Sequence, residues 1–263
     1  MRDAVIETIA EALRAEPAVR ALYLTGSYGA GIEDEHSDLD FVAVIAGDAA
    51  SFTARWREAV GRTGEIVLWW DQTAHQLQIM AITADWSRFD VVYLTREQMA
   101  KRAQKNMRVV FDHDDIFASL PPSLPKPVPN PAQVRTQFES FLRVLGLLSL
   151  AIDREDYLVG VTGVFHLRTI LTDLLVDETG VSPRGGALNL KRQLTTEQKA
   201  LLEGLPIPAP TRDSVIAANL AIAAAYLPRA RARAAALGVE WPERFEAATW
   251  AHLGRWLGVA RPY

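Results

Sequence analysis

The sequence predicts an α+β protein in which a small mixed-sheet domain precedes a helical bundle. The first 120 residues alternate helical and strand-like hydrophobic patterns, whereas from about Ala132 onward helical spacing dominates and strand signals almost disappear. Six prolines between positions 121 and 131 separate the two halves and favour a stiff, extended connector. We therefore expect one domain over residues 1–126 and a second over residues 127–263.

The first half begins with a helix and continues as short strands. Val5, Ile6, Ile9 and Leu13 recur at helical spacing, and Pro17 ends that helix. The turn Thr83–Ser87 joins two of the later strands as a hairpin. Apolar runs predict strands at Ala21–Leu24, Phe41–Ile45, Glu65–Trp70, Gln76–Ile82, Arg88–Leu94 and Met107–Phe111, with a helix at Ser51–Val60.

The second half is predicted to be a bundle of helices. A buried stripe on its first long helix consists of Val134, Phe138, Phe141, Leu142 and Leu145. Further helices are expected over Val161–Val176, Ser214–Leu237 and Phe245–Val259. We expect the bundle to pack against the sheet, with the ligand site in the groove between the two domains.

Composition agrees with a soluble enzyme and gives no sign of a nucleic-acid or membrane partner. The 263 residues can bury a large core, and the formal net charge of −4 gives no overall positive field for DNA or RNA. The chain has no cysteine, which excludes disulfides, thiolate zinc sites and cysteine nucleophiles. The N-terminus shows no secretory hydrophobic segment, and the longest apolar run, Val144–Ile152, is too short to span a bilayer. We expect a cytoplasmic protein; its oligomeric state stays open.

The most informative stretch joins a glycine-rich turn to a pair of aspartates. Gly26-Ser27-Tyr28-Gly29-Ala30-Gly31 follows one predicted strand, and Ser37-Asp38-Leu39-Asp40 leads into the next. Side chains two positions apart on a strand share a face, so Asp38 and Asp40 should project together. Two carboxylates beside free backbone N–H groups can hold Mg²⁺ and a polyphosphate at once. This combination indicates a nucleotidyl-transfer site.

A third acidic residue, Asp90, stands between Phe89 and Val91 in a strand interior that usually selects against aspartate. One interpretation makes Asp90 a further carboxylate of the same site. The alternative is an exposed strand residue paired with Arg88 or Arg96.

The spacing Gly-Ser-x₃-Gly-x₅-Ser-Asp-x-Asp resembles the signature of the polymerase-β-like nucleotidyltransferase superfamily, especially its aminoglycoside and lincosamide nucleotidyltransferases. The resemblance implies that one or two Mg²⁺ ions bind to Asp38, Asp40 and Asp90. It also implies that ATP is the co-substrate, and that AMP moves to a hydroxyl of a small acceptor while pyrophosphate leaves. Gly26, Ser27 and Ser37 would then contact the nucleotide.

The resemblance extends to a basic segment in the second half. Leu188–Leu194 is similar to a lysine-bearing segment of the lincosamide nucleotidyltransferases, which makes Lys191 or Arg192 a candidate cation for the pyrophosphate. The alternative is that both residues decorate the start of a surface helix. Short matches of this kind leave the identity of the acceptor open.

Several other features have both a functional and a plain structural interpretation. Asp112–Asp115 is expected to be a solvated hairpin turn, and His36 a surface-loop residue. Arg154–Tyr157 and Arg168 are either acceptor contacts or ordinary parts of the helices. Trp69, Trp70 and Trp86 either stack a base or sugar or, as we expect, pack at the domain interface.

Two alternatives to a small-molecule enzyme stay open. The first is a nucleotidyltransferase-fold protein that modifies or binds a protein partner, as antitoxin-type members do. The second is an RNA-modifying relative, which the acidic balance disfavours.

Overall fold

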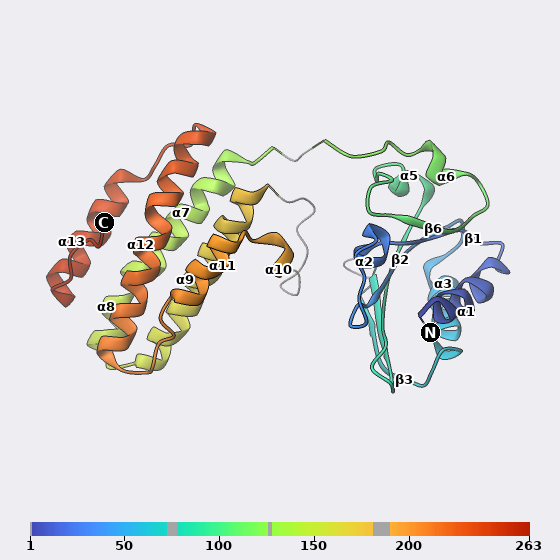
Figure 1. Ribbon diagram of the computed structural model, residues 1–263, viewed down its shortest axis with the longest axis horizontal. Helices are drawn as coiled ribbons and strands as arrows, with labels where there is room; N and C mark the ends of the chain where they lie inside the picture. Colours follow the sequence, from blue (N-terminus) through green and yellow to red (C-terminus); the bar gives the residue numbers. More distant parts are fainter. Residues whose placement is uncertain (1, 73–77, 126–127, 181–189) are drawn as a thin grey trace. The chain divides into compact units, whose positions relative to one another are not determined.

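The computed structural model describes residues 2–72, 78–125, 128–180 and 190–263, and the chain divides into two compact units, Met1–Pro125 and Lys126–Tyr263 (Figure 1). The first unit contains a mixed sheet with helices, and the described part of the second contains helices. The α+β fold class predicted from the sequence is confirmed.

The first unit is built on a six-stranded sheet with the strand order β3-β4-β5-β2-β1-β6. Only β2 and β5 run parallel, and the other neighbouring strands are antiparallel. The strands are β1 (Val19–Leu24), β2 (Leu39–Ile45), β3 (Ile66–Asp71), β4 (Gln78–Thr83), β5 (Arg88–Leu94) and β6 (Arg108–Asp112).

The two faces of this sheet carry separate apolar clusters. Helices α1 (Arg2–Arg14) and α3 (Ala49–Gly61) cover the face that contains Phe41 and Phe89. Val42 and Leu94 point to the opposite face, which the short helices α5 (Arg96–Met99) and α6 (Ile116–Ser119) cover. Because side chains alternate along a strand, Asp40 and Asp90 lie on the Val42 side, away from α1 and α3.

Most predicted elements of the first unit are confirmed, with two differences. The glycine-rich turn contains a short helix, α2 (Gly26–Ala30), which ends at Gly31 with φ +67°. Asp112–Asp115 is not a solvated hairpin turn: the Asp112 carboxylate accepts hydrogen bonds from the N–H groups of Ile116 and Phe117, at 3.1 and 2.8 Å. A carboxylate at the start of a helix satisfies N–H groups that the helix itself cannot, so Asp112 anchors α6.

Part of the predicted hairpin lies outside the described residues. The strand expected from Gln76 is described from Gln78 onward, where it pairs antiparallel with β5. The stretch of prolines is described for residues 121–125 and 128–131. Its first part is attached to the preceding loop, since Gln104 and Lys105 donate backbone hydrogen bonds to the carbonyls of Pro121 and Pro122.

The second unit is a helical bundle with its own core. Its helices are α7 (Pro131–Gly146), α8 (Leu148–Asp153), α9 (Tyr157–Thr179), α10 (Leu190–Gln193), α11 (Thr196–Gly204), α12 (Arg212–Leu237) and α13 (Glu243–Leu257). Phe141 stacks on Tyr226 at a ring-centroid distance of 3.8 Å, joining α7 to α12. Helices α8 and α11 were not predicted from the sequence, and α10 corresponds to the surface helix that was the alternative interpretation of Lys191 and Arg192.

Helix α9 is longer than the helix predicted over Val161–Val176. Among the described helices it alone has the length and hydropathy of a membrane span. Leu167, Leu171 and Leu175 on α9 are fully buried in the core that α7 and α12 share. Those contacts are typical of the central helix of a bundle.

Candidate active site

The sheet brings two of the three predicted aspartates into direct register. Asp40 on β2 pairs with Asp90 on the parallel strand β5, so their side chains leave the same face at adjacent positions. Asp38 stands one residue before β2 begins at Leu39. The sequence indicated all three aspartates separately, and the strand pairing places Asp90, 50 positions further along the chain, beside Asp40.

The three carboxylates affect one another electrostatically. Burial, then the charges of Asp38 and Asp90, raise the pKa of Asp40 to about 6. Burial and the charge of Asp38 likewise raise the pKa of Asp90 to about 6. Like charges that are held together and partly removed from water oppose ionisation. A bound cation would offset the repulsion between the carboxylates and so favour their ionised forms.

Gly26 allows the turn to pass against the Asp40 carboxylate. Its φ of +55° lies in the left-handed region, and a Cβ at this position would stand 1.9 Å from Asp40 Oδ2. The next residue before it, Thr25, donates a backbone hydrogen bond of 2.8 Å to the Asp40 carbonyl. Only glycine combines that backbone conformation with so close an approach. The turn and the carboxylate are therefore one assembly.

Ser27 presents a hydroxyl without a protein partner. Its Oγ is buried and has no hydrogen-bond partner among the described residues. A buried hydroxyl without a partner is costly, so the Ser27 hydroxyl has hydrogen-bonding capacity that the described residues leave unused. Ser37, by contrast, is used within its own loop: its Oγ accepts from the Asp34 N–H at 2.9 Å and donates to Asp34 Oδ1 at 3.1 Å.

Two polar residues beside the carboxylates were missed in the sequence as site residues. Arg88 lowers the pKa of both Asp40 and Asp90 through its positive charge, and the Gln78 side chain hydrogen-bonds to Asp90. Arg88 precedes Asp90 by two positions, so the strand period was a usable signal. Gln78 reaches Asp90 through strand pairing opposite Val92, which the sequence does not reveal. Neither Arg88 nor Arg96 forms an ion pair with Asp90 among the described residues, and Arg96 instead lies 3.8 Å from Asp114.

The donor atoms of this site fit a hard divalent cation. Carboxylate oxygens are the protein ligands that Mg²⁺ prefers, and Asp38, Asp40 and Asp90 supply them beside the unpartnered Ser27 hydroxyl. Within the described ranges, no three His, Cys, Asp or Glu side chains stand close enough together to form a ready-made metal site. The three aspartates repel one another, so their carboxylates would come close enough to share an ion only when the ion is bound.

The two predicted cations lie on the other unit. Lys191 and Arg192 are exposed on α10, and the Gly185–Asn189 turn before them falls outside the described residues. Their contact with a nucleotide stays a prediction.

Arg154–Tyr157 joins α8 to α9, and Asp156 caps α9 by accepting from the Val159 N–H at 3.2 Å. Arg168 donates to the carbonyl of Leu202 at 2.5 Å.

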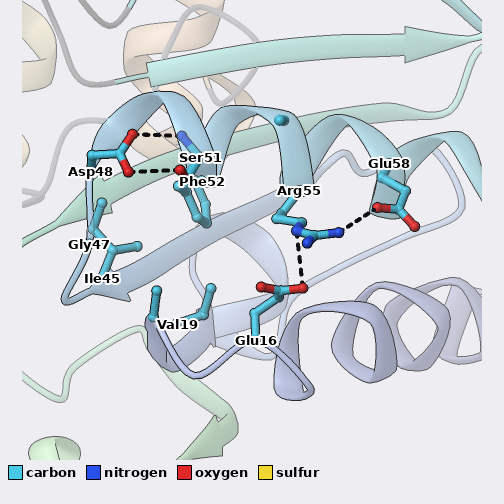
Figure 2. Close-up of a pocket in the computed structure, with 11 residues that line it drawn as sticks. Glu16, Val19, Ile45, Gly47, Asp48, Ser51, Phe52, Arg55 and Glu58 are labelled. Atoms are coloured by element: carbon cyan, nitrogen blue, oxygen red, sulfur yellow. Dashed lines mark hydrogen bonds and ion pairs between the residues drawn. The ribbon is translucent and has the colours of Figure 1, made fainter.

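A separate cavity of about 420 Å³ lies beside the start of α3, near Ile45 at the other end of β2 from Asp40 (Figure 2). Its charged side chains are satisfied by one another: Arg55 bonds to Glu16 at 3.0 Å and to Glu58 at 3.2 Å. Asp48 caps α3 through Ser51. The paired lining offers no group for catalysis, so the carboxylate cluster is the candidate active site.

Comparisons with known proteins give structural likenesses and no sequence match. No protein-family model and no curated protein sequence matches the chain. An aminoglycoside 6-adenyltransferase from Bacillus subtilis is similar at 15% identity, covering 96% of this chain and 97% of that one, with a TM-score of 0.45. A nucleotidyltransferase-like protein from Exiguobacterium sibiricum is 13% identical, covering 98% and 78%, with a TM-score of 0.40. A CCA-adding enzyme is 14% identical, covering 97% and 62%, with a TM-score of 0.32.

By their names, these solved structures are an adenyltransferase, a nucleotidyltransferase-like protein and a CCA-adding enzyme. All of the TM-scores lie below 0.5, so the likenesses add nothing about chemistry. The function rests on the geometry of the site.

Proposed function

We propose that the protein is a Mg²⁺-dependent nucleotidyltransferase that moves AMP from ATP to a hydroxyl of a small-molecule acceptor and releases pyrophosphate. The observation that carries the proposal is the pairing of Asp40 with Asp90, within reach of the charge of Asp38 and against the Gly26 turn. Catalysis of phosphoryl-type transfer consists mainly of positioning and electrostatic stabilisation. A carboxylate cluster beside a turn that can receive phosphates supplies both.

Asp38, Asp40 and Asp90 are the residues that would hold the divalent cation. When bound, Mg²⁺ neutralises charge on the phosphate oxygens and polarises the phosphorus that is attacked. Gly26 and Ser27 would position the phosphate tail, with the Ser27 hydroxyl donating to a phosphate oxygen. That donation satisfies a hydroxyl that otherwise has no partner among the described residues.

The chemical step is an in-line displacement at the α-phosphorus. The acceptor oxygen forms a bond to that phosphorus, and the bond to the bridging oxygen breaks, so that pyrophosphate leaves with the electron pair. Asp90 would complete the metal site or accept the acceptor's proton. Its pKa of about 6 leaves it mostly ionised at neutral pH, as a proton acceptor must be. Lys191 or Arg192 would balance the charge of the departing pyrophosphate.

A thermal-shift panel tests the nucleotide part of the proposal. A ligand that binds only the folded protein raises its melting temperature by mass action. We expect ATP with millimolar Mg²⁺ to raise the melting temperature of the wild type, and Asp40→Asn to remove most of that rise. If no triphosphate shifts the wild type at any Mg²⁺ concentration, the proposal is wrong and a protein-binding role takes its place.

The acceptor is tested by release of pyrophosphate. We expect a hydroxylated small molecule, with aminoglycosides and lincosamides screened first, to release pyrophosphate from ATP in the wild type and not in Asp40→Asn. The product should gain the mass of an AMP group. Release without any acceptor adduct would point instead to hydrolysis of ATP.

A further inference from the structure

The segment between α5 and β6 lies on the same face of the sheet as the Asp40 side chain. Met99, the last residue of α5, is buried in the apolar cluster that contains Val42, and Met107, just before β6, packs against that cluster. Residues 100–107 therefore cross the face to which the Asp40 carboxylate projects. We call this segment the cross-face loop.

The cross-face loop is in direct contact with the glycine-rich turn. A Cβ on Gly29 would stand 2.2 Å from the carbonyl oxygen of Asn106 and 2.8 Å from that of Leu24. Asn106 has a left-handed φ of +60°, a conformation that asparagine adopts more readily than most residues. Since Gly29 is two positions after Ser27, the loop meets the same turn that carries the buried hydroxyl without a partner among the described residues.

Hydrogen bonds fasten the cross-face loop to the chain around α6. The Lys105 N–H donates to the carbonyl of Pro122 at 3.0 Å. The Gln104 N–H donates to the carbonyl of Pro121 at 2.9 Å, and its side chain to the carbonyl of Phe117 at 3.0 Å. A loop that is bonded in this way and packed against a glycine holds its side chains at a fixed place beside the turn.

Four exposed cations lie on this loop or directly after it, in a chain whose formal net charge is −4. None of them forms an ion pair with another described residue; they are Lys101, Arg102, Lys105 and Arg108. Lys105 directly precedes Asn106, where the loop touches the turn. Arg108 is directed elsewhere, since its guanidinium lies 5.9 Å from the centre of the Tyr28 ring, which belongs to the apolar cluster of the opposite face.

A nucleotide at this site needs a positive side chain near its phosphates. A triphosphate with one Mg²⁺ keeps about two net negative charges. It would lie beside the carboxylates of Asp38, Asp40 and Asp90, which add negative charge of their own. Lysine suits this task because it offers a compact charge with three donors on a flexible stem.

We propose that Lys105 binds the terminal phosphates of the nucleotide, and that the cross-face loop holds it beside the glycine-rich turn. The inference rests on the proposed function, because it names the cation that meets the phosphate tail of the same site. It assigns binding of the tail to the first unit, and leaves Lys191 or Arg192 to balance the pyrophosphate as it departs.

Isothermal titration in millimolar Mg²⁺, with ATP and with inorganic tripolyphosphate, tests this assignment. Lys105→Gln removes the charge of an exposed side chain and leaves the backbone bonds of the loop in place. We expect it to weaken the binding of both ligands by about 10- to 100-fold, the range for a lost charge-assisted contact. Tripolyphosphate has no base or sugar, so an equal loss for both ligands locates the contact at the phosphates.

Two further variants serve as controls. Lys101→Gln makes the same substitution at the α5 end of the loop, where the Lys101 N–H donates to the Gln98 carbonyl at 3.2 Å. Its affinities should stay within about twofold of the wild type, since distant exposed charges are screened. Lys105→Arg keeps the charge, so its affinities should stay within about threefold. All three variants should melt within about 2 °C of the ligand-free wild type, because the substituted side chains are exposed.

Each result bears on the proposal. Unchanged binding of both ligands by Lys105→Gln would overturn it, and so would an equal loss in Lys101→Gln or in Lys105→Arg. A loss confined to ATP would also overturn it, because Lys105 would then contact the base or the sugar. If the wild type binds neither ligand in Mg²⁺, the proposed function itself fails. That outcome is distinct from one in which the wild type and Lys105→Gln bind both ligands equally well.

Discussion

Replacing Asp40 with asparagine should make the metal-free protein more stable while it abolishes nucleotidyl transfer. The Asp40 carboxylate accepts no hydrogen bond from the described residues, and burial together with Asp38 and Asp90 raises its pKa from 3.8 to about 6. An asparagine of nearly the same size keeps the packing and removes the unfavourable charge. Loss of activity and gain of stability should therefore appear in the same variant.

The size of the gain follows from the pKa. A rise of about two units corresponds to about 3 kcal/mol at about 1.4 kcal/mol per unit. Because Asp40 is only partly buried and shares its charge effects with two neighbours, solvent screening reduces this to about 1–2 kcal/mol.

The pH dependence gives the sign of the effect. A carboxyl whose pKa is higher in the folded state binds its proton more tightly there, so wild-type stability falls as the pH rises from 3.8 to about 6. Asparagine does not titrate. The extra stability of Asp40→Asn should be complete above about pH 7 and vanish near about pH 4.

Chemical denaturation of both proteins in chelator, at several pH values, measures this difference. Asp114→Asn is a matched control of opposite sign, because Arg20 lowers the pKa of Asp114 and its neutralisation should destabilise the protein at neutral pH. The reasoning would be refuted if Asp40→Asn lowered stability equally at pH 7.5 and pH 4. Transfer activity above about a tenth of the wild type would reject the assigned role of Asp40.

Three further predictions concern the turn, the third aspartate and the distant cations. Gly26→Ala should reduce the rate of transfer at least about 100-fold, because the new Cβ would displace the Asp40 carboxylate. Gly31 has a similar φ but open space around it, so Gly31→Ala should cost only about 1 kcal/mol of stability and little activity. Asp90→Ala should weaken Mg²⁺–ATP binding in isothermal titration if Asp90 is a metal ligand, or lower kcat by about 10²–10⁴ with binding intact if it is the base; normal turnover would exclude it from the site. Lys191→Ala should weaken ATP binding by about 1–3 kcal/mol, and unchanged affinity in both Lys191→Ala and Arg192→Ala would show that another cation meets the pyrophosphate.

Local patterns in the sequence were sufficient to predict the sheet and the position of its first two acids. Strands of five to seven residues such as β2 and β5 have apolar runs that stand out, and the Asp-x-Asp spacing places two carboxylates at a strand start. Asp90 was recognised because an acid is unusual between Phe89 and Val91. Its register opposite Asp40 depends on a parallel pairing between strands far apart in the chain, which no local pattern specifies.

The features that the sequence did not predict also depend on contacts between distant parts of the chain. Helix α2 was expected to be a turn, since Gly26 and Gly29 are poor helix formers and only their close packing against Asp40 and Asn106 explains the observed backbone. Gln78 joins the site through its position across the sheet, and Asp112 caps α6 instead of lying in a solvated turn. In each case a tertiary contact decided the outcome.

The separate cores of the two units have a consequence for calorimetry. Residues such as Phe41 and Phe89 are buried only within the first unit, and Phe141 and Tyr226 only within the second. Each unit can therefore melt as its own cooperative transition, and a heating scan would resolve two peaks where the midpoints differ. A nucleotide held by the first unit alone would shift one peak and leave the other in place. A ligand that both units grip would shift both, so the number of peaks that move would report how many units contribute contacts to the bound state.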